Sequence, residues 1–372
     1  MIRKPKSITL KDVAKEAGVS IGMASRVLGR YGSYSERTRK SVSKAAAKLN
    51  YRANGVARSL RLKQTRTIGV MINSIASYHW TIFVQGVEEA ARAAGFYVIL
   101  CNTDDSAKLE KEYLENLRER GVDGIIAAPQ EENFGVFKQL AETGYPLVLV
   151  NCEIPGIEIT RVVSDDRSAA TDAVAHLVLL GHQRIGVIAG LMSIVSSQNR
   201  MDGYKEGLAK AGLPFDESLV AYGNYLKEDA FAAASKLITM DDRPTALLVC
   251  NELMTRATLE CINSLNIAVP QDMSLIGFDD PAWAHFYRPP ITTLREERFY
   301  MGQLASDALV SAIQNTDSGL RAAPEIRLKT ELVIRESCAE PNALVKLESR
   351  KPSNPNLIAV PLVTSDARSE KS

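Results

Sequence analysis

The chain of 372 residues is long enough for two or three domains, and 45% hydrophobic and 24% charged residues are typical of a globular protein. No apolar run reaches the roughly 18 residues of a membrane span, and no apolar segment follows the basic residues 1–6, which argues against membrane-spanning and secreted proteins. The five cysteines show no C-x-x-C spacing, so we expect reduced thiols in the cytoplasm and no zinc site.

The net charge of +1 conceals a strong asymmetry along the chain. Of the 45 basic and 44 acidic residues, 16 and 3 fall within residues 1–63, which leaves 29 and 41 for the remainder. A basic segment of this kind is typical of one that binds nucleic acid. A segment that binds a membrane surface and a solvated arm would have the same composition.

Three short helices are predicted in this basic segment. Thr9, Ser20 and Ser35 are the expected N-caps, and Gly18 marks the turn between the first two helices. The apolar positions recur at helical spacing, and they are Leu10, Val13, Ala14 and Ala17, then Ala24, Val27 and Leu28, then Val42, Ala45, Ala46 and Leu49. Two helices joined by a tight turn and closed by a third make the helix-turn-helix arrangement.

The outward face of the second helix is predicted to read the major groove of DNA. Arg26 can bridge guanine O6 and N7, and Ile21 can pack on a thymine methyl. The full set of expected contacts on this helix is Ser20, Ile21, Gly22, Ser25 and Arg26. The alternative is a solvated helical bundle with ordinary surface charges. Residues 18–22 also match the G-x-S-x-G pattern of a catalytic serine, but that motif requires a preceding strand, and a helix is expected here.

Residues 9–20 (TLKDVAKEAGVS) and 25–28 (SRVL) resemble the headpiece of the LacI (lactose-repressor-like) family, and residues 49–60 (LNYRANGVARSL) resemble its hinge helix. The resemblance implies that the hinge helices of a dimer fold on operator DNA, where a leucine, here Leu60, enters the minor groove and kinks the duplex. It further implies DNA contacts by Tyr51, Asn54, Ala57 and Arg58. Ala53 and Gly55 replace the family's usual proline and its frequent alanine, which would loosen the hinge helix.

From about residue 67 onward, strands alternate with amphipathic helices. Apolar runs predict buried parallel strands at residues 67–72, 97–100, 124–128, 146–150, 184–189, 246–250 and 274–278. Helices are predicted at residues 83–94, 109–120, 169–180 and 200–211, with 193–199 as a loop. Two series of such units, divided near residues 164–167, predict two doubly wound α/β subdomains with a cleft between them.

The resemblance to the LacI family continues through this body, and it implies the fold of periplasmic sugar-binding proteins. The family's ligand-binding positions correspond to Asn73, Trp80, Asn151, Arg200, Tyr225, Asn251, Asp279 and Glu296, with charged Arg298 at a further pocket position. Amides and carboxylates can bind adjacent hydroxyls, and Trp80 and Tyr225 offer flat faces to a sugar ring. We therefore expect a small effector that is a sugar, a sugar acid or a polyol.

The expected domain boundaries are residues 7–52 for the headpiece, 53–63 for the hinge helix, 66–340 for the body and 341–372 for a disordered tail. The resemblance implies three crossings between the subdomains, near residues 164, 293 and 324. The first subdomain would then comprise about 66–164 and 294–324, and the second about 165–293 and 325–340.

The sequence therefore predicts a cytoplasmic transcriptional regulator without cofactor, metal, enzymatic activity or membrane partner. It is expected to repress carbohydrate-related genes as a homodimer on a palindromic double-stranded operator. A regulator of the same fold that responds to a partner protein, and a non-regulatory metabolite-binding protein, are the alternatives. A Rossmann-type enzyme is disfavoured because no G-x-G-x-x-G follows the first strand.

Overall fold

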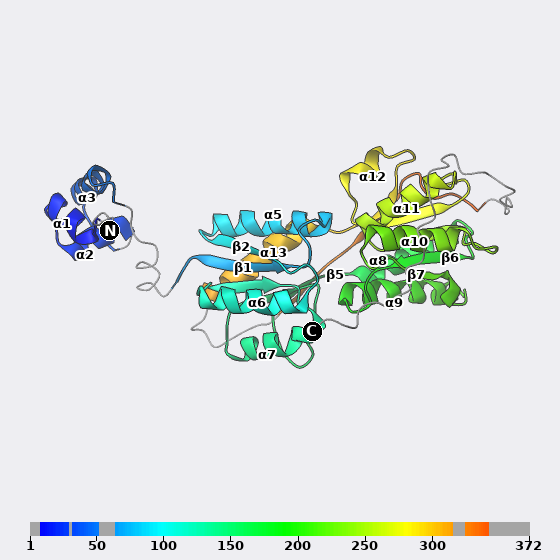
Figure 1. Ribbon diagram of the computed structural model, residues 1–372, viewed down its shortest axis with the longest axis horizontal. Coiled ribbons are helices and arrows are strands. Elements are labelled where there is room, and N and C mark those ends of the chain that lie inside the picture. The colour runs from blue at the N-terminus through cyan, green and yellow to red at the C-terminus, as the bar shows by residue number, and fades with distance from the viewer. Residues whose placement is uncertain (1–7, 30–31, 52–63, 315–323, 342–372) are drawn as a thin grey trace, which may run out of the picture.

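The computed structural model describes residues 8–29, 32–51, 64–314 and 324–341, which form a helical headpiece and a body of two α/β subdomains (Figure 1). Residues 52–63 and 342–372, which include the predicted hinge helix and tail, lie outside the described residues. No helix in the described part of the chain is both long and apolar enough to span a membrane.

The headpiece consists of α1 (Leu10–Ala17), α2 (Ile21–Gly29) and α3 (Glu36–Lys48). Each helix begins where the sequence predicts. The Asp12 carboxylate accepts hydrogen bonds from the backbone and hydroxyl of Thr9, and the Ser20 hydroxyl accepts one from the backbone of Met23 at 3.1 Å. Gly18 ends α1 with φ of +66°, a conformation that favours glycine. The predicted apolar positions meet in one small core, which confirms the three-helix arrangement.

The first subdomain is built on a six-stranded parallel sheet of order β11-β5-β4-β3-β1-β2. Its strands are β1 (Thr67–Ile72), β2 (Tyr97–Asn102), β3 (Gly124–Ala127), β4 (Leu147–Val150), β5 (Arg161–Ser164) and β11 (Glu325–Leu328). Helices α5 (Tyr78–Ala93) and α13 (Arg298–Gln314) form one core with the sheet, and α6 (Ala107–Glu119) and α7 (Phe134–Glu142) form another (Figure 1). A short 3-10 turn, η1 (Glu131–Asn133), precedes α7.

The second subdomain repeats the plan with the strand order β12-β10-β9-β8-β6-β7, and only β12 runs antiparallel to its neighbour. Its strands are β6 (Ile185–Ala189), β7 (Val220–Tyr222), β8 (Ala246–Val249), β9 (Ser274–Phe278), β10 (Thr292–Arg295) and β12 (Glu331–Val333). Its helices are α8 (Asp166–Leu179), α9 (Val195–Lys210), η2 (Glu217–Leu219), α10 (Lys227–Ile238), α11 (Glu252–Ser264) and α12 (Ala282–Phe286). These elements enclose a single large apolar core.

Three very short segments connect the subdomains, and two of them lie later in the chain than predicted. The first crossing is at Asp165, between β5 and α8, as expected. The second lies at residues 296–297, because β10 still belongs to the second sheet. The third lies at residues 329–330, so the prediction near residue 324 was wrong: β11 pairs with β5 of the first sheet. The position near residue 324 came from the family resemblance, and β11, whose residues are exposed or only partly buried, has no apolar run that could have corrected it.

The helix predicted from residue 200 begins one turn earlier than expected. Helix α9 starts at Val195, so Arg200 lies in its second turn and not at its start. Residues 195–199 (VSSQN) carry no clear amphipathic pattern, which explains the late predicted boundary. Helices α5 and α13 pack closely, because Gly86 faces the backbone of Phe299 and Gly302 faces that of Phe83.

Candidate functional site

The outer face of α2 presents the residues that the sequence assigns to DNA reading. Ile21 is 49% exposed in spite of its apolar side chain, and Gly22 and Arg26 are also exposed. An exposed isoleucine beside an arginine fits a surface that packs on thymine methyls and bonds to guanine. Ser25 is half-buried, and Ser20 is exposed while it caps the helix.

Tyr51 packs against the headpiece core and is half-buried, so at least part of its side chain serves the fold of the headpiece. The other predicted contacts at Asn54, Ala57, Arg58 and Leu60 lie outside the described residues. The assignment of the hinge therefore stays a prediction.

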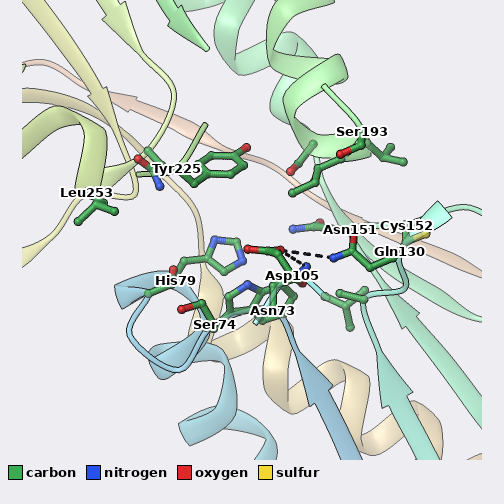
Figure 2. A pocket seen from close by; sticks show the side chains of 18 of the residues that line it. Asn73, Ser74, His79, Asp105, Gln130, Asn151, Cys152, Ser193, Tyr225 and Leu253 are labelled. Atoms are coloured by element: carbon green, nitrogen blue, oxygen red, sulfur yellow. Dashed lines mark hydrogen bonds between the residues drawn. The ribbon is translucent and has the colours of Figure 1, made fainter. Parts of the chain in front are cut away.

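A cavity of about 260 Å³ lies between the two subdomains, at the carboxyl ends of both sheets (Figure 2). Asn73 follows β1, Asp105 follows β2 and Asn151 follows β4 on one side; Tyr225 follows β7 and Asp279 follows β9 on the other. Parallel strands end at a common edge, so loops that are far apart in sequence converge there, as is usual for ligand sites in α/β sheets.

Seven of the eight predicted effector residues line this cavity, namely Asn73, Trp80, Asn151, Arg200, Tyr225, Asn251 and Asp279. The eighth, Glu296, does not. Its side chain is only 1% exposed and lies behind Arg200, to which it is bonded. Glu296 occupies a crossing segment, so its position supports the cavity wall instead of facing the ligand space.

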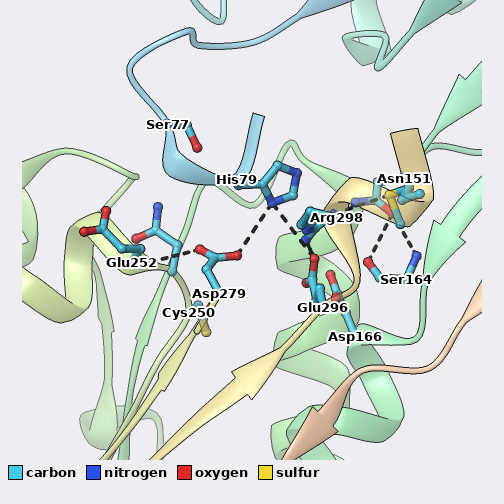
Figure 3. A network of polar contacts seen from close by, with 12 residues as sticks. Ser77, His79, Asn151, Ser164, Asp166, Cys250, Glu252, Asp279, Glu296 and Arg298 are labelled. Atoms are coloured by element: carbon cyan, nitrogen blue, oxygen red, sulfur yellow. Dashed lines mark hydrogen bonds and ion pairs between the residues drawn. The ribbon is translucent and has the colours of Figure 1, made fainter. Parts of the chain in front are cut away.

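Arg200 is the centre of a buried ionic network beneath the cavity, and its partners Asp166 and Glu296 are labelled in Figure 3. Its Nε donates to Asp166 Oδ2 at 3.1 Å, its Nη2 donates to Glu296 Oε1 at 2.9 Å, and its Nη1 donates to the carbonyl of Cys250. Its guanidinium also lies 4.2 Å from the centre of the Phe278 ring. Burial opposes the charge of Arg200, but the nearby carboxylates, Asp166 foremost, raise its pKa above the ordinary value.

His79 joins the two subdomains at this network, a position that its sequence context did not reveal. It lies in the first turn of α5, and its Nδ1 is 3.6 Å from Asp279 Oδ1 and 4.0 Å from Glu296 Oε2. Burial, together with the charge of Arg298, lowers the pKa of His79 to about 4, so the ring is neutral at pH 7. Burial alone would raise the pKa of Asp279, but His79, Arg200 and Arg298 hold it well below its usual range.

His79, Asp279 and Glu296 have the donor atoms of a metal site, which lie within 4.8 Å of one another. Arg298, however, forms an ion pair with Glu296, and Arg200 binds the same carboxylate. Two guanidinium groups already occupy the place of a bound cation. The cluster therefore fits a network of ion pairs better than a metal centre.

The first subdomain contributes a polar group that sequence reasoning missed. Asp105 lines the cavity, and its Oδ1 accepts hydrogen bonds from Asn73 Nδ2 at 2.7 Å and from Gln130 Nε2 at 3.4 Å (Figure 2). Its place directly after an apolar strand, at the edge where ligands bind, was the available signal.

Other lining groups are positioned by local backbone structure. Asn151, Tyr225 and Asp279 have φ of 48°, 60° and 79°, a region that non-glycine residues seldom adopt. Strained conformations of this kind are concentrated at binding sites. Asn151 Oδ1 accepts from the backbone and hydroxyl of Ser164, and Asn251 Oδ1 caps α11 by accepting from the backbone of Met254.

Comparison with known proteins finds relatives for both the headpiece and the body. A family profile described as "Bacterial regulatory proteins, lacI family" matches residues 9–54, and one described as "Periplasmic binding protein-like domain" matches residues 174–338. The chain is 34% identical to "Probable HTH-type transcriptional regulator EndR" of Paenibacillus polymyxa over 90% of this chain and 99% of that protein. It is 31% identical to the HTH-type transcriptional repressor PurR of Haemophilus influenzae over 88% of this chain and 98% of that protein.

Solved structures show the same relationship. The lac repressor dimer bound to operator and the anti-inducer ONPF matches with a TM-score of 0.80 and 28% identity, over 90% of this chain and all of that one. A complex of the transcriptional regulator CelR with cellobiose matches with a TM-score of 0.67 and 27% identity, over 89% of this chain and 99% of that one. With a DNA-reading headpiece joined to a two-subdomain body, the chain belongs to the lacI family of bacterial regulatory proteins and is a DNA-binding transcriptional regulator.

Proposed function

We propose that the protein represses carbohydrate-related genes by binding a palindromic operator as a homodimer, and that a small polyhydroxylated effector in the cavity controls this binding. The observation that carries the proposal is the cavity of about 260 Å³, which both subdomains line with amides, carboxylates and aromatic rings. A ligand held by both subdomains favours one of their relative arrangements, and this difference in affinity is the energy available to move the headpieces.

The chemistry of the lining supports a sugar, a sugar acid or a polyol. Trp80 and Tyr225 provide ring surfaces, and the polar groups of Asn73, Asn151 and Asp279 can bind hydroxyls. Cellobiose in the CelR complex, and ribose in a LacI-family regulator from Enterococcus faecium with a TM-score of 0.66 and 25% identity, are ligands of related proteins. A planar base is the second candidate, because the two aromatic side chains could also stack on it.

Ligand screening by thermal shift on the full chain tests the effector. We expect one class of sugar, sugar acid or polyol to raise the unfolding midpoint, and the same compound to change operator affinity. A base that stabilises the chain while no hydroxylated compound does so would favour the second candidate. If no metabolite binds but a partner protein alters operator binding, the regulator responds to that protein.

DNA binding is tested by anisotropy titrations with operator fragments at several salt concentrations. Each neutralised phosphate contributes about −0.9 to the log–log salt slope, so the basic headpieces of a dimer should give a steep slope. A nearly flat slope, or a monomer as the binding species, would contradict the proposal. A chain that binds metabolite without any DNA affinity would instead be a non-regulatory binding protein.

A further inference from the structure

We propose that the cavity selects an uncharged polyhydroxylated effector and excludes its anionic counterparts, and that Asp105 determines this selectivity. The inference rests on the proposed function and narrows it, since a sugar acid and a sugar phosphate are then poor ligands. It follows from the charges that line the cavity, from the partners of its arginines and from the hydrogen-bonding groups that remain unused.

The cavity lining carries an excess of negative charge. Four carboxylates line it, those of Asp104, Asp105, Glu252 and Asp279, against the single guanidinium of Arg200. His79, which also lines the cavity, adds no positive charge at pH 7, because burial lowers its pKa to about 4. An anionic ligand would therefore enter a space of like charge.

The arginines are not available to compensate for a ligand's negative charge. Arg200 already binds Asp166 at 3.1 Å and Glu296 at 2.9 Å, and Arg298 is paired with Glu296. With Asp279 included, three buried carboxylates surround two buried guanidinium groups, so the network holds no surplus positive charge. Bringing a further anion out of water next to this network would be costly, whereas an uncharged ligand carries no such penalty.

Asp105 adds unused acceptor capacity to the cavity. Asp105 uses only Oδ1 toward Asn73 and Gln130, which leaves its Oδ2 without a bond to another described residue. A hydroxyl can donate to such oxygens, whereas a ligand carboxylate or phosphate dianion offers only acceptors.

Asp105 is the carboxylate best placed to distinguish the two ligand classes. Two amides hold it at the edge of the first sheet, and its side chain points into the cavity (Figure 2). It lies outside the buried network, so it can be changed without uncoupling Arg200 from Asp166 and Glu296.

The test compares matched pairs of ligands by calorimetry on the full chain. The pairs are glucose with glucuronate, galactose with galacturonate, ribose with ribose 5-phosphate, and cellobiose with cellobionate. We expect the neutral member of the binding pair to bind about tenfold or more tightly than its anionic partner, which corresponds to roughly 1.4 kcal/mol. Asp105→Asn should reduce this affinity ratio to about threefold or less, because the anionic ligand then binds more tightly. Asp105→Glu keeps the negative charge and should leave the ratio unchanged.

Glu115→Gln is the control, because it removes one negative charge from the exposed surface of α6 and should leave the ratio unchanged. An anionic member that binds more tightly than its neutral partner, or a ratio that is the same in Asp105→Asn and wild type, would overturn the inference while leaving the proposed function in place. Binding by none of the pairs, in a chain that still binds operator, would instead refute the proposed effector class and the inference with it.

Discussion

Replacing Arg200 by alanine should destabilise the body far more than an ordinary surface substitution. The change leaves Asp166 buried without an ion-pair partner and Glu296 with Arg298 alone, and the side chains of the two acids are 2% and 1% exposed. Removing one partner of a buried ion pair costs about 3–5 kcal/mol. Since 1 kcal/mol lowers the midpoint of a domain of this size by about 2–4 °C, we expect the thermal midpoint to fall by about 6–20 °C.

Arg167→Ala is the matched control for this measurement. Arg167 also forms an ion pair, with Glu206 at 2.8 Å, but the two side chains are 56% and 33% exposed, so its loss should leave the midpoint nearly unchanged. Thermal unfolding followed by circular dichroism measures both variants. The double variant Arg200→Ala with Glu296→Ala should lose less stability than the two single changes together, because the two side chains are bonded to each other and each single change already removes that bond.

Below its unfolding midpoint, Arg200→Ala should still bind operator but should not respond to the effector. The headpiece has its own core and does not depend on the network. An Arg200→Ala variant as stable as Arg167→Ala would show that the ionic network does not hold the body together. A folded variant that fails to bind operator in the absence of ligand would contradict the separation of the two sites.

Four further predictions concern pH, packing and DNA binding. Burial raises the pKa of Glu110 to about 7 from 4.5, so the contribution of this residue to stability is present at low pH and is lost as pH rises through this range. In urea unfolding, the stability of Glu110→Gln relative to wild type should therefore increase by an amount on the order of 3 kcal/mol between pH 4.5 and 8. A difference in stability that stays constant with pH would refute this. Gly86→Ala should cost about 1–3 kcal/mol of stability, because its new Cβ would lie 2.0 Å from the carbonyl oxygen of Phe299 in α13. Gly135→Ala, whose Cβ would have no atom within 4 Å, should be neutral or stabilising in the same unfolding assay. Arg26→Ala should relax the sequence preference at one base pair of each half-site by about 1–3 kcal/mol. Leu60→Ala should weaken binding to the operator more than binding to random DNA. Competition measurements that give equal losses on both DNAs for a variant would contradict the DNA contact assigned to that residue.

The headpiece and the central strands could be predicted because their signals are local. Capping by Thr9 and Ser20 and the apolar stripe of α1 depend on residues within a few positions of one another. Strands such as β1 and β9 are buried along almost their whole length, and they therefore appear as continuous apolar runs. Most cavity residues follow such strands, so the prediction of the strands and the family resemblance together located them.

Tertiary structure alone decided which charged groups meet. Arg200 is 34 residues from Asp166 and 96 residues from Glu296, and no local pattern encodes such pairings. The place of Glu296 behind the cavity and the contact of His79 with Asp279 depend on how two separately folded subdomains face one another. The same is true of β11, whose short and partly exposed sequence acquires its strand conformation only by pairing with β5. The sequence by itself thus determined the elements and the edge at which ligands bind, whereas the electrostatics of the cavity arise from contacts that form only when distant segments are brought together.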